Sequence, residues 1–185
     1  QRFNDLSKKK IPNSLAKKKL NLDNVCTLLF LGTLDKNKKP NKLIEVMNSI
    51  DIKVNVIFLG DGVLYNELKK LNHKNVLMPG HVKSNIELYL SASDIVIVPG
   101  RAGMNISESL AFGLPVIVHQ ADGIEYDLIK NGENGFIIPD DEIETYCFFI
   151  KEIMSENFEF TNDINYNANT MAMSIANGCK KALRL

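Results

Sequence analysis

The feature that most constrains the fold is an apolar strand followed at once by a glycine loop and a helix. Residues Asp94–Val98 read DIVIV, a β-branched run without polar alternation, which favours a strand covered on both faces in a parallel sheet. A proline and a glycine end this strand. A short helix is predicted from Asn105 to about Gly113, and a second apolar strand follows at 116–118. This succession predicts one unit of an α/β domain.

Strand and helix signals alternate in the same way along most of the chain. Strands are predicted at 25–31, 54–59, 75–78, 94–98, 116–118 and 135–138, and further helices at 41–48, 63–71, 85–91, 123–130 and 143–154. The alternation predicts the α/β class, with a Rossmann-like, doubly wound parallel sheet wrapped by helices.

The flanks of this domain read differently. Residues 1–23 are polar and basic around Pro12, which predicts an extended arm or an interdomain linker. The domain proper is expected at 24–154. A C-terminal loop and helix are expected over 155–185, with the helix at 171–185.

Composition limits the partners of the chain. It has 185 residues, of which 45% are hydrophobic, and a formal net charge of zero, which argues against a nucleic-acid binder. Three widely spaced cysteines indicate a reducing compartment, so a cytoplasmic location is expected. Lysine triplets at 8–10 and 17–19 form either a solvated linker or a peripheral contact with anionic lipid at the inner face of the membrane.

In a doubly wound sheet, ligands bind outside the carboxyl ends of the strands, so the residues after each strand are candidate contacts. Gly60 and Gly62 precede a helix and form half of a dinucleotide fingerprint. The loop 100–104 and the helix that begins near Asn105 offer free N–H groups and a helix dipole to an anion such as a diphosphate, and Arg101 adds a positive charge.

Alternatives stay open at several of these positions. Glu108 stands three residues after Asn105, so it is either a capping-box partner or a ligand contact. Arg101 is either an anion contact or a solvated loop charge. Glu125 either binds the ligand or caps the next helix. Isolated histidines are interpreted as surface or packing residues, so no metal site is expected: His73, His81 and His119.

Taken in order, these segments resemble the carboxyl-terminal, donor-binding domain of the GT-B glycosyltransferases, especially the family-4 type known as glycosyl transferases group 1. The matching pieces are FLGTLDKNKKP at 30–40, LGDGVL at 59–64, NVLMPGHV at 75–82, ASD at 92–94, ESLAFGLPVI at 108–117, GIE at 123–125 and NGENGF at 131–136. The resemblance implies a retaining hexosyltransferase that takes a nucleotide-diphosphate sugar, with a UDP-sugar as the expected donor. The acceptor would be a glycan or lipid-linked molecule in cell-surface polysaccharide or glycoconjugate synthesis, and no cofactor is expected beside the nucleotide sugar.

The resemblance also assigns roles by position. Glu108 matches the carboxylate that hydrogen-bonds the ribose of the nucleotide, and Lys38 matches a lysine that contacts the donor diphosphate. Val82 lies in the segment whose backbone contacts the base. The residues expected to take part in catalysis are Lys38, Glu108 and Arg101. The residues expected to bind substrate are Gly32, Thr33, Gly60, Gly62, Val82, Gly100, Ala102, Gly103, Met104, Asn105 and Glu125.

Two positions depart from the family pattern. Gly100 stands where the family has a glutamate that touches the donor sugar, and Thr33 stands where it has an arginine that touches the diphosphate. Arg101 is hypothesised to replace the lost cation from the neighbouring loop. The departures motivate a second hypothesis, a non-catalytic nucleotide-binding or assembly module of the same fold. Half of a nucleotide-sugar epimerase is a third.

The family also has an amino-terminal domain that binds the acceptor. We expect this domain either in the same polypeptide or as a separate subunit.

Overall fold

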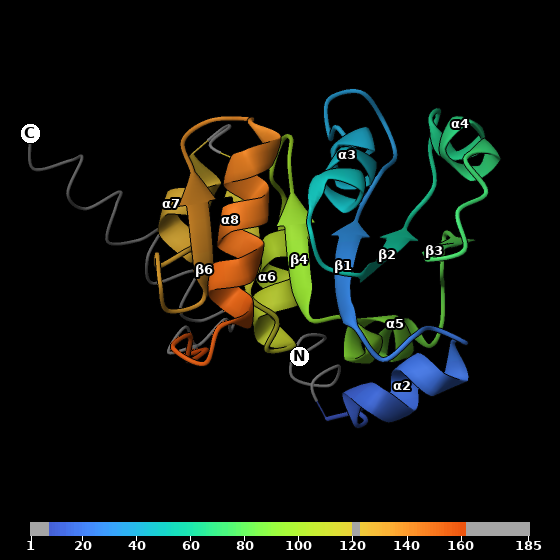
Figure 1. The fold of residues 1–185 in the computed structure, drawn as a ribbon, viewed down its shortest axis with the longest axis horizontal. Coiled ribbons are helices and arrows are strands. Elements are labelled where there is room, and N and C mark those ends of the chain that lie inside the picture. Colours follow the sequence, from blue (N-terminus) through green and yellow to red (C-terminus); the bar gives the residue numbers. More distant parts are fainter. Residues whose placement is uncertain (1–7, 120–122, 162–185) are drawn as a thin grey trace, which may run out of the picture.

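The computed structural model describes residues 8–119 and 123–161. They contain a six-stranded sheet in the order β3-β2-β1-β4-β5-β6, with every neighbouring pair parallel (Figure 1). The strands are β1 (Cys26–Leu31), β2 (Val54–Leu59), β3 (Val76–Gly80), β4 (Ile95–Val98), β5 (Val116–His119) and β6 (Gly135–Ile138). The strand order reverses between β1 and β4, which is the topological switch point of a doubly wound sheet. The predicted fold class is confirmed.

Helices cover both faces of the sheet. They are α2 (Asn13–Lys19), α3 (Asn41–Ser49), α4 (Tyr65–Lys70), α5 (Ile86–Ala92), α6 (Met104–Ala111), α7 (Ile124–Leu128) and α8 (Ile143–Met154). In Figure 1, α3 and α8 lie in front of the strands, and α6 lies behind them. The predicted strands and helices within 24–154 are therefore present, with ends that differ by at most two residues.

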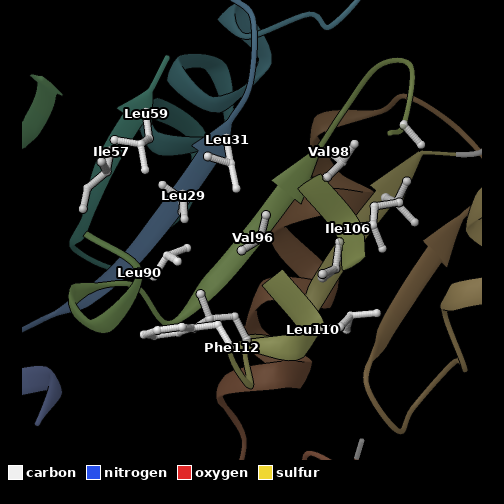
Figure 2. Packing of buried hydrophobic residues seen from close by; sticks show 14 of the residues in the cluster. Leu29, Leu31, Ile57, Leu59, Leu90, Val96, Val98, Ile106, Leu110 and Phe112 are labelled. Carbon is white, nitrogen blue, oxygen red and sulfur yellow. The ribbon is translucent and has the colours of Figure 1, made fainter. Parts of the chain in front are cut away.

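Alternate residues of the buried strands build two separate cores. Leu29 and Leu31 of β1 pack with side chains of α5 and α6, as Figure 2 shows. Leu28 and Phe30 point to the other face and pack with side chains of α3, α4 and α8. Every residue of β1 and β2 is buried, which is why both strands are mostly apolar, each with one buried polar residue, Thr27 and Asn55.

The segment after α6 shows how a loop residue ends a helix. Gly113 has a φ of +80°, a conformation that favours glycine. The N–H groups of Gly113 and Leu114 donate to the carbonyl oxygens of Leu110 and Ser109, both at 3.0 Å. The predicted stop at Gly113 is therefore found, and it turns the chain directly into β5.

Helix α2 corrects the prediction of an extended arm at 1–23. It packs beside α5 at the edge of the sheet where the strands begin (Figure 1). Ala16 is fully buried, and the Lys17 ammonium lies 2.7 Å from a carboxylate oxygen of Asp94. The lysine run predicted a solvated segment, because the sequence does not show that Lys17 pairs with Asp94 far along the chain. The predicted helix at 171–185 and most of the loop at 155–169 lie outside the described residues.

Candidate functional site

A cavity of about 380 Å³ opens at the carboxyl edge of the sheet, beside the switch point. The loops after β1, β2 and β3 line it together with the starts of α5 and α6. Residues predicted to bind substrate that line the cavity are Gly32, Thr33, Gly60, Val82, Asn105 and Glu108. Lining residues outside that prediction are Leu31, Leu59, Asp61, His81 and Ile86. The fold thus gathers much of the predicted set around one cavity.

Backbone contacts hold the first two loops of the cavity together. The N–H of Gly32 donates to the carbonyl oxygen of Leu59 at 3.1 Å. A Cβ atom at Gly60 would collide with the carbonyl oxygen of Gly32. A Cβ atom at Gly62 would lie 2.5 Å from the carbonyl oxygen of Leu34. Gly60 therefore shapes the cavity wall, whereas Gly62 does not line the cavity and serves the packing of the two loops.

The start of α6 differs from the prediction. The helix begins at Met104 with Gly103 as its N-cap, and no side chain caps it. Asn105 was predicted as the cap, but its side-chain amide donates to the carbonyl oxygen of Leu31 at 3.0 Å. The Asn105 side chain therefore bonds the end of β1 and does not cap the helix. Glu108 lies too far along α6 for a capping box with Gly103, and it lines the cavity.

Lys38 lies outside the cavity lining and bridges two loops. Its ammonium donates to the carbonyl oxygen of Arg101 and, at 3.0 Å, to that of Ala102. The side chain of Arg101 is exposed, and Ala102 is buried. In these positions Lys38 holds the loop that leads into α6, and neither cation lines the cavity wall.

Gly100 lies where the family's carboxylate is missing, and its surroundings give a steric reason. A Cβ atom there would collide with the carbonyl oxygen of Asn37 and would lie 2.7 Å from the Cα of Lys38. The backbone of the loop after β1 occupies the space where a longer side chain would begin. Any side chain at Gly100 would push the two loops apart.

Three other residues predicted to bind substrate, Gly103, Met104 and Glu125, do not line the cavity. Gly103 is extended, and the Met104 side chain is 71% exposed at the first position of α6. Glu125 is fully buried, and its carboxylate accepts the N–H of Gly123 at 3.0 Å at the start of α7. The structure therefore supports the capping alternative for Glu125, and a substrate contact there stays a prediction.

The five lining residues outside the prediction include two polar side chains, His81 and Asp61, and one residue of a helix, Ile86. His81 was interpreted as a surface or packing residue; it is exposed, which agrees with the surface alternative, and it also lines the cavity. Asp61 also lines it, with a carboxylate oxygen 2.7 Å from the N–H of Gly62. His81 directly follows β3 and Asp61 stands two residues after the end of β2, so their positions carried the signal. Ile86 comes from α5 and carried none.

Residues 8–119 and 123–161 hold no group of three or more His, Cys, Asp or Glu side chains that could bind a metal ion. Within the same ranges, no helix combines the length and apolar character needed to cross a membrane.

The fold and the cavity together define an α/β domain with a cavity at the switch point of a doubly wound sheet. The chain belongs to the family glycosyl transferases group 1, whose model matches residues 13–171. The predicted family resemblance is confirmed, and it extends into α2 on one side and past the predicted domain end on the other.

Individual relatives are similar over different shares of their length. The "Uncharacterized 41.2 kDa protein in cps region" of Klebsiella pneumoniae is 27% identical over 131 residues, which cover 68% of this chain and 34% of that protein. Anabaena Alr3699/HepE in complex with UDP and glucose has a TM-score of 0.77 at 20% identity, covering 96% of this chain and 54% of that one. The C-terminal domain of LpcC, a glycosyl transferase group 1 family protein from Francisella tularensis, has a TM-score of 0.64 at 16% identity. The match covers 81% of this chain and 87% of that domain. The chain thus spans about a third of the Klebsiella protein and about half of the HepE chain.

Proposed function

We propose that this chain is the nucleotide-sugar-binding part of a glycosyltransferase and that the nucleotide is UDP. The observation that carries the proposal is the cavity at the switch point, where Glu108 of α6 shares a wall with the loops after three strands. Membership of the family and the UDP complex of HepE support it.

In this proposal the cavity divides into a nucleoside part and a diphosphate part. The Glu108 carboxylate accepts hydrogen bonds from the ribose hydroxyls, because an ionised acceptor binds neighbouring hydroxyls strongly. The base lies against the segment that contains Val82. The diphosphate lies toward the first turn of α6, where free N–H groups and the helix dipole favour an anion.

The reaction would break the bond between the anomeric carbon of the sugar and the diphosphate oxygen. A hydroxyl oxygen of the acceptor forms the new bond, and its proton passes to the departing diphosphate. The nucleoside diphosphate leaves as an anion, stabilised by the start of α6 and by the positive charge of Lys38. A retaining course, an acceptor from cell-surface polysaccharide or glycoconjugate synthesis, and a separate acceptor domain are further parts of the proposal. The cps-region relative supports the polysaccharide assignment.

Titration calorimetry with UDP, GDP and ADP tests the proposal. We expect UDP to bind and Glu108→Ala to weaken its binding by about tenfold or more, because a charge-assisted hydrogen bond contributes about 1.5–3 kcal/mol. Glu156→Ala is the matched control, since Glu156 is exposed and follows α8. Absence of binding to all three nucleotides overturns the proposed function. Unchanged UDP affinity in Glu108→Ala shows that Glu108 does not contact the ribose.

The second candidate is a non-catalytic module that binds the nucleotide without transferring a sugar. Gly100 favours it, because the adjacent backbone leaves no room for a carboxylate at that position. Both candidates predict UDP binding. Turnover of a UDP-sugar by the complete protein, with release of UDP, distinguishes the transferase from the binding module.

A further inference from the structure

Two loops at the carboxyl edge of the sheet are bonded to each other along their backbones. We call residues 35–38, after β1, and residues 99–102, after β4, the paired loops; both lie above the carboxyl ends of their strands (Figure 1). The N–H of Arg101 donates to the carbonyl oxygen of Asn37 at 3.0 Å. The ammonium of Lys38 donates to the carbonyl oxygens of Arg101 and Ala102. The missing Cβ of Gly100 permits this approach.

One side chain fixes the geometry of the first of these loops. A carboxylate oxygen of Asp35 accepts the N–H of Asn37 at 2.8 Å and the N–H of Lys38 at 3.0 Å. The same two residues supply the carbonyl oxygen and the ammonium that hold the second loop. An Asp side chain that bonds backbone groups two and three residues on imposes a defined turn. The N–H of Lys38 also donates to the main-chain carbonyl oxygen of Asp35 at 3.2 Å, so the side chain reinforces a turn that presents both partners to the loop after β4.

The second loop in turn carries the start of α6. Ala102 precedes Gly103, the N-cap of that helix, and a Cβ atom at Gly103 would lie 3.7 Å from the Lys38 ammonium. Asn105, in the first turn, and Glu108, in the second, line the cavity. A shift of the paired loops would therefore move both the cation and the cavity wall.

We propose that Asp35 is a positioning residue for the diphosphate side of the cavity, acting through the backbone of Asn37 and Lys38 on the start of α6. The inference rests on the proposed function, because it assigns the diphosphate to that side. Asp35 itself does not line the cavity, and it acts through other groups.

The test compares Asp35→Ala, which removes the acceptor, with Asp35→Asn, which keeps an oxygen at the same place. In Asp35→Ala we expect UDP affinity to fall about tenfold and exchange of the Arg101 amide hydrogen to rise about tenfold, because two charge-assisted hydrogen bonds are lost. Asp35→Asn should return both values to within about threefold of wild type, since a neutral acceptor is weaker than a carboxylate.

Asp140→Ala is the matched control. Its carboxylate also accepts a nearby backbone N–H, that of Glu142 at 3.2 Å, at the start of α8. We expect it to change neither readout. If Asp35→Ala does not fold, Asp35→Gln replaces it, because the longer side chain carries its acceptor away from the turn.

The two arms separate this proposal from the proposed function. Unchanged UDP affinity in Asp35→Ala, with wild-type binding intact, overturns the positioning role. Equal losses in Asp35→Ala and Asp35→Asn also overturn it, because the acceptor geometry would then be irrelevant. If wild type binds no nucleotide, the proposed function fails. The exchange arm then decides alone whether Asp35 holds the paired loops.

Discussion

Gly100 makes a close backbone contact in the structure that its place in the sequence does not predict. In the sequence it marks a carboxylate that the family has and this chain lacks. In the structure the backbone of Asn37 and Lys38 lies against its Cα, so that the loops after β1 and β4 touch. The packing of the two loops therefore requires glycine at this position. A glutamate placed there would separate the loops instead of restoring the family's carboxylate.

We predict that Gly100→Ala destabilises the fold by about 2 kcal/mol, as expected when a methyl group is forced into a packed contact. Gly103→Ala is the control in the same loop, because a Cβ atom there meets its nearest neighbours at 3.6 Å and 3.7 Å. We expect the control to change the free energy of unfolding by less than about 0.5 kcal/mol. Urea unfolding followed by circular dichroism measures both. Equal stabilities for the two variants would contradict the contact at Gly100.

At the scale of elements, α2 shows how tertiary contacts use residues that look like a solvated run. The Asp94 carboxylate receives the Lys17 ammonium, the side-chain amide of Asn13 at 3.1 Å and the N–H of Thr27 at 2.8 Å. Lys10 is exposed, but it also contacts the domain, with its ammonium 5.5 Å from the centre of the Phe112 ring. Part of the basic segment is thus used inside the fold, which leaves fewer lysines for an anionic surface.

We predict that Lys17→Met destabilises the chain by about 2 kcal/mol, because it leaves the Asp94 carboxylate without its cation in a largely buried pair. Methionine keeps most of the apolar stem, so the loss reports the ammonium. Lys18→Met, at an exposed position on the same helix, should stay within about 0.5 kcal/mol of wild type. Thermal and urea unfolding give the comparison. A loss of similar size in both variants would mean that α2 contributes only through its general charge.

At the scale of the whole molecule, three aspartates join distant elements by ion pairs. Asp23 lies 2.7 Å from Lys53, Asp51 lies 2.6 Å from Lys151, and Asp141 lies 2.7 Å from Lys39. Hydrogen bonds from Lys53 and Lys151 lower the pKa values of Asp23 and Asp51.

The pKa of Asp141 is also lowered, although burial opposes this shift. Burial by itself would raise its pKa, but hydrogen bonds from Lys39 and Tyr146 and the charge of Lys42 bring the pKa below its ordinary value. A carboxyl group with a lowered pKa in the folded state stabilises that state above its unfolded pKa of about 3.9. The stabilisation is lost as the pH falls through the folded value.

We therefore predict that the free energy of unfolding decreases as the pH is lowered from about 4 toward 2. Asp141→Asn should be less stable than wild type at neutral pH, and the difference should shrink over that acid range. Tyr146→Phe removes the 3.0 Å hydrogen bond to Asp141 and keeps the ring. In this background, the loss of stability caused by Asp141→Asn at neutral pH should be smaller than in wild type. Urea unfolding at a series of pH values measures it. A difference that does not vary with pH would show that the Asp141 pairs do not contribute.

Much of the fold was predictable because its signals are local. The runs at 26–31, 54–59 and 95–98 are buried on both faces, so apolar residues dominate their sequences, with Thr27 and Asn55 as buried polar exceptions. The start of α6 was predicted within one residue, but the role of Asn105 was not, because its amide bonds the end of β1. In the cavity, the rule that ligands lie after parallel strands located Gly32, Gly60 and Val82. The same rule left His81 and Asp61 without a role, and it has no means of finding Ile86.

The sequence by itself determined the order of strands and helices, the parallel α/β class and the edge at which a ligand would bind, because these follow from apolar periodicity and from loop residues next to each strand. Only the tertiary structure decided which loops touch. Lys38 meets Arg101 across 63 positions, Leu31 meets Asn105 across 74, and Lys17 meets Asp94 across 77. Such contacts form because the sheet order brings β1 beside β4, and no short stretch of sequence contains both partners.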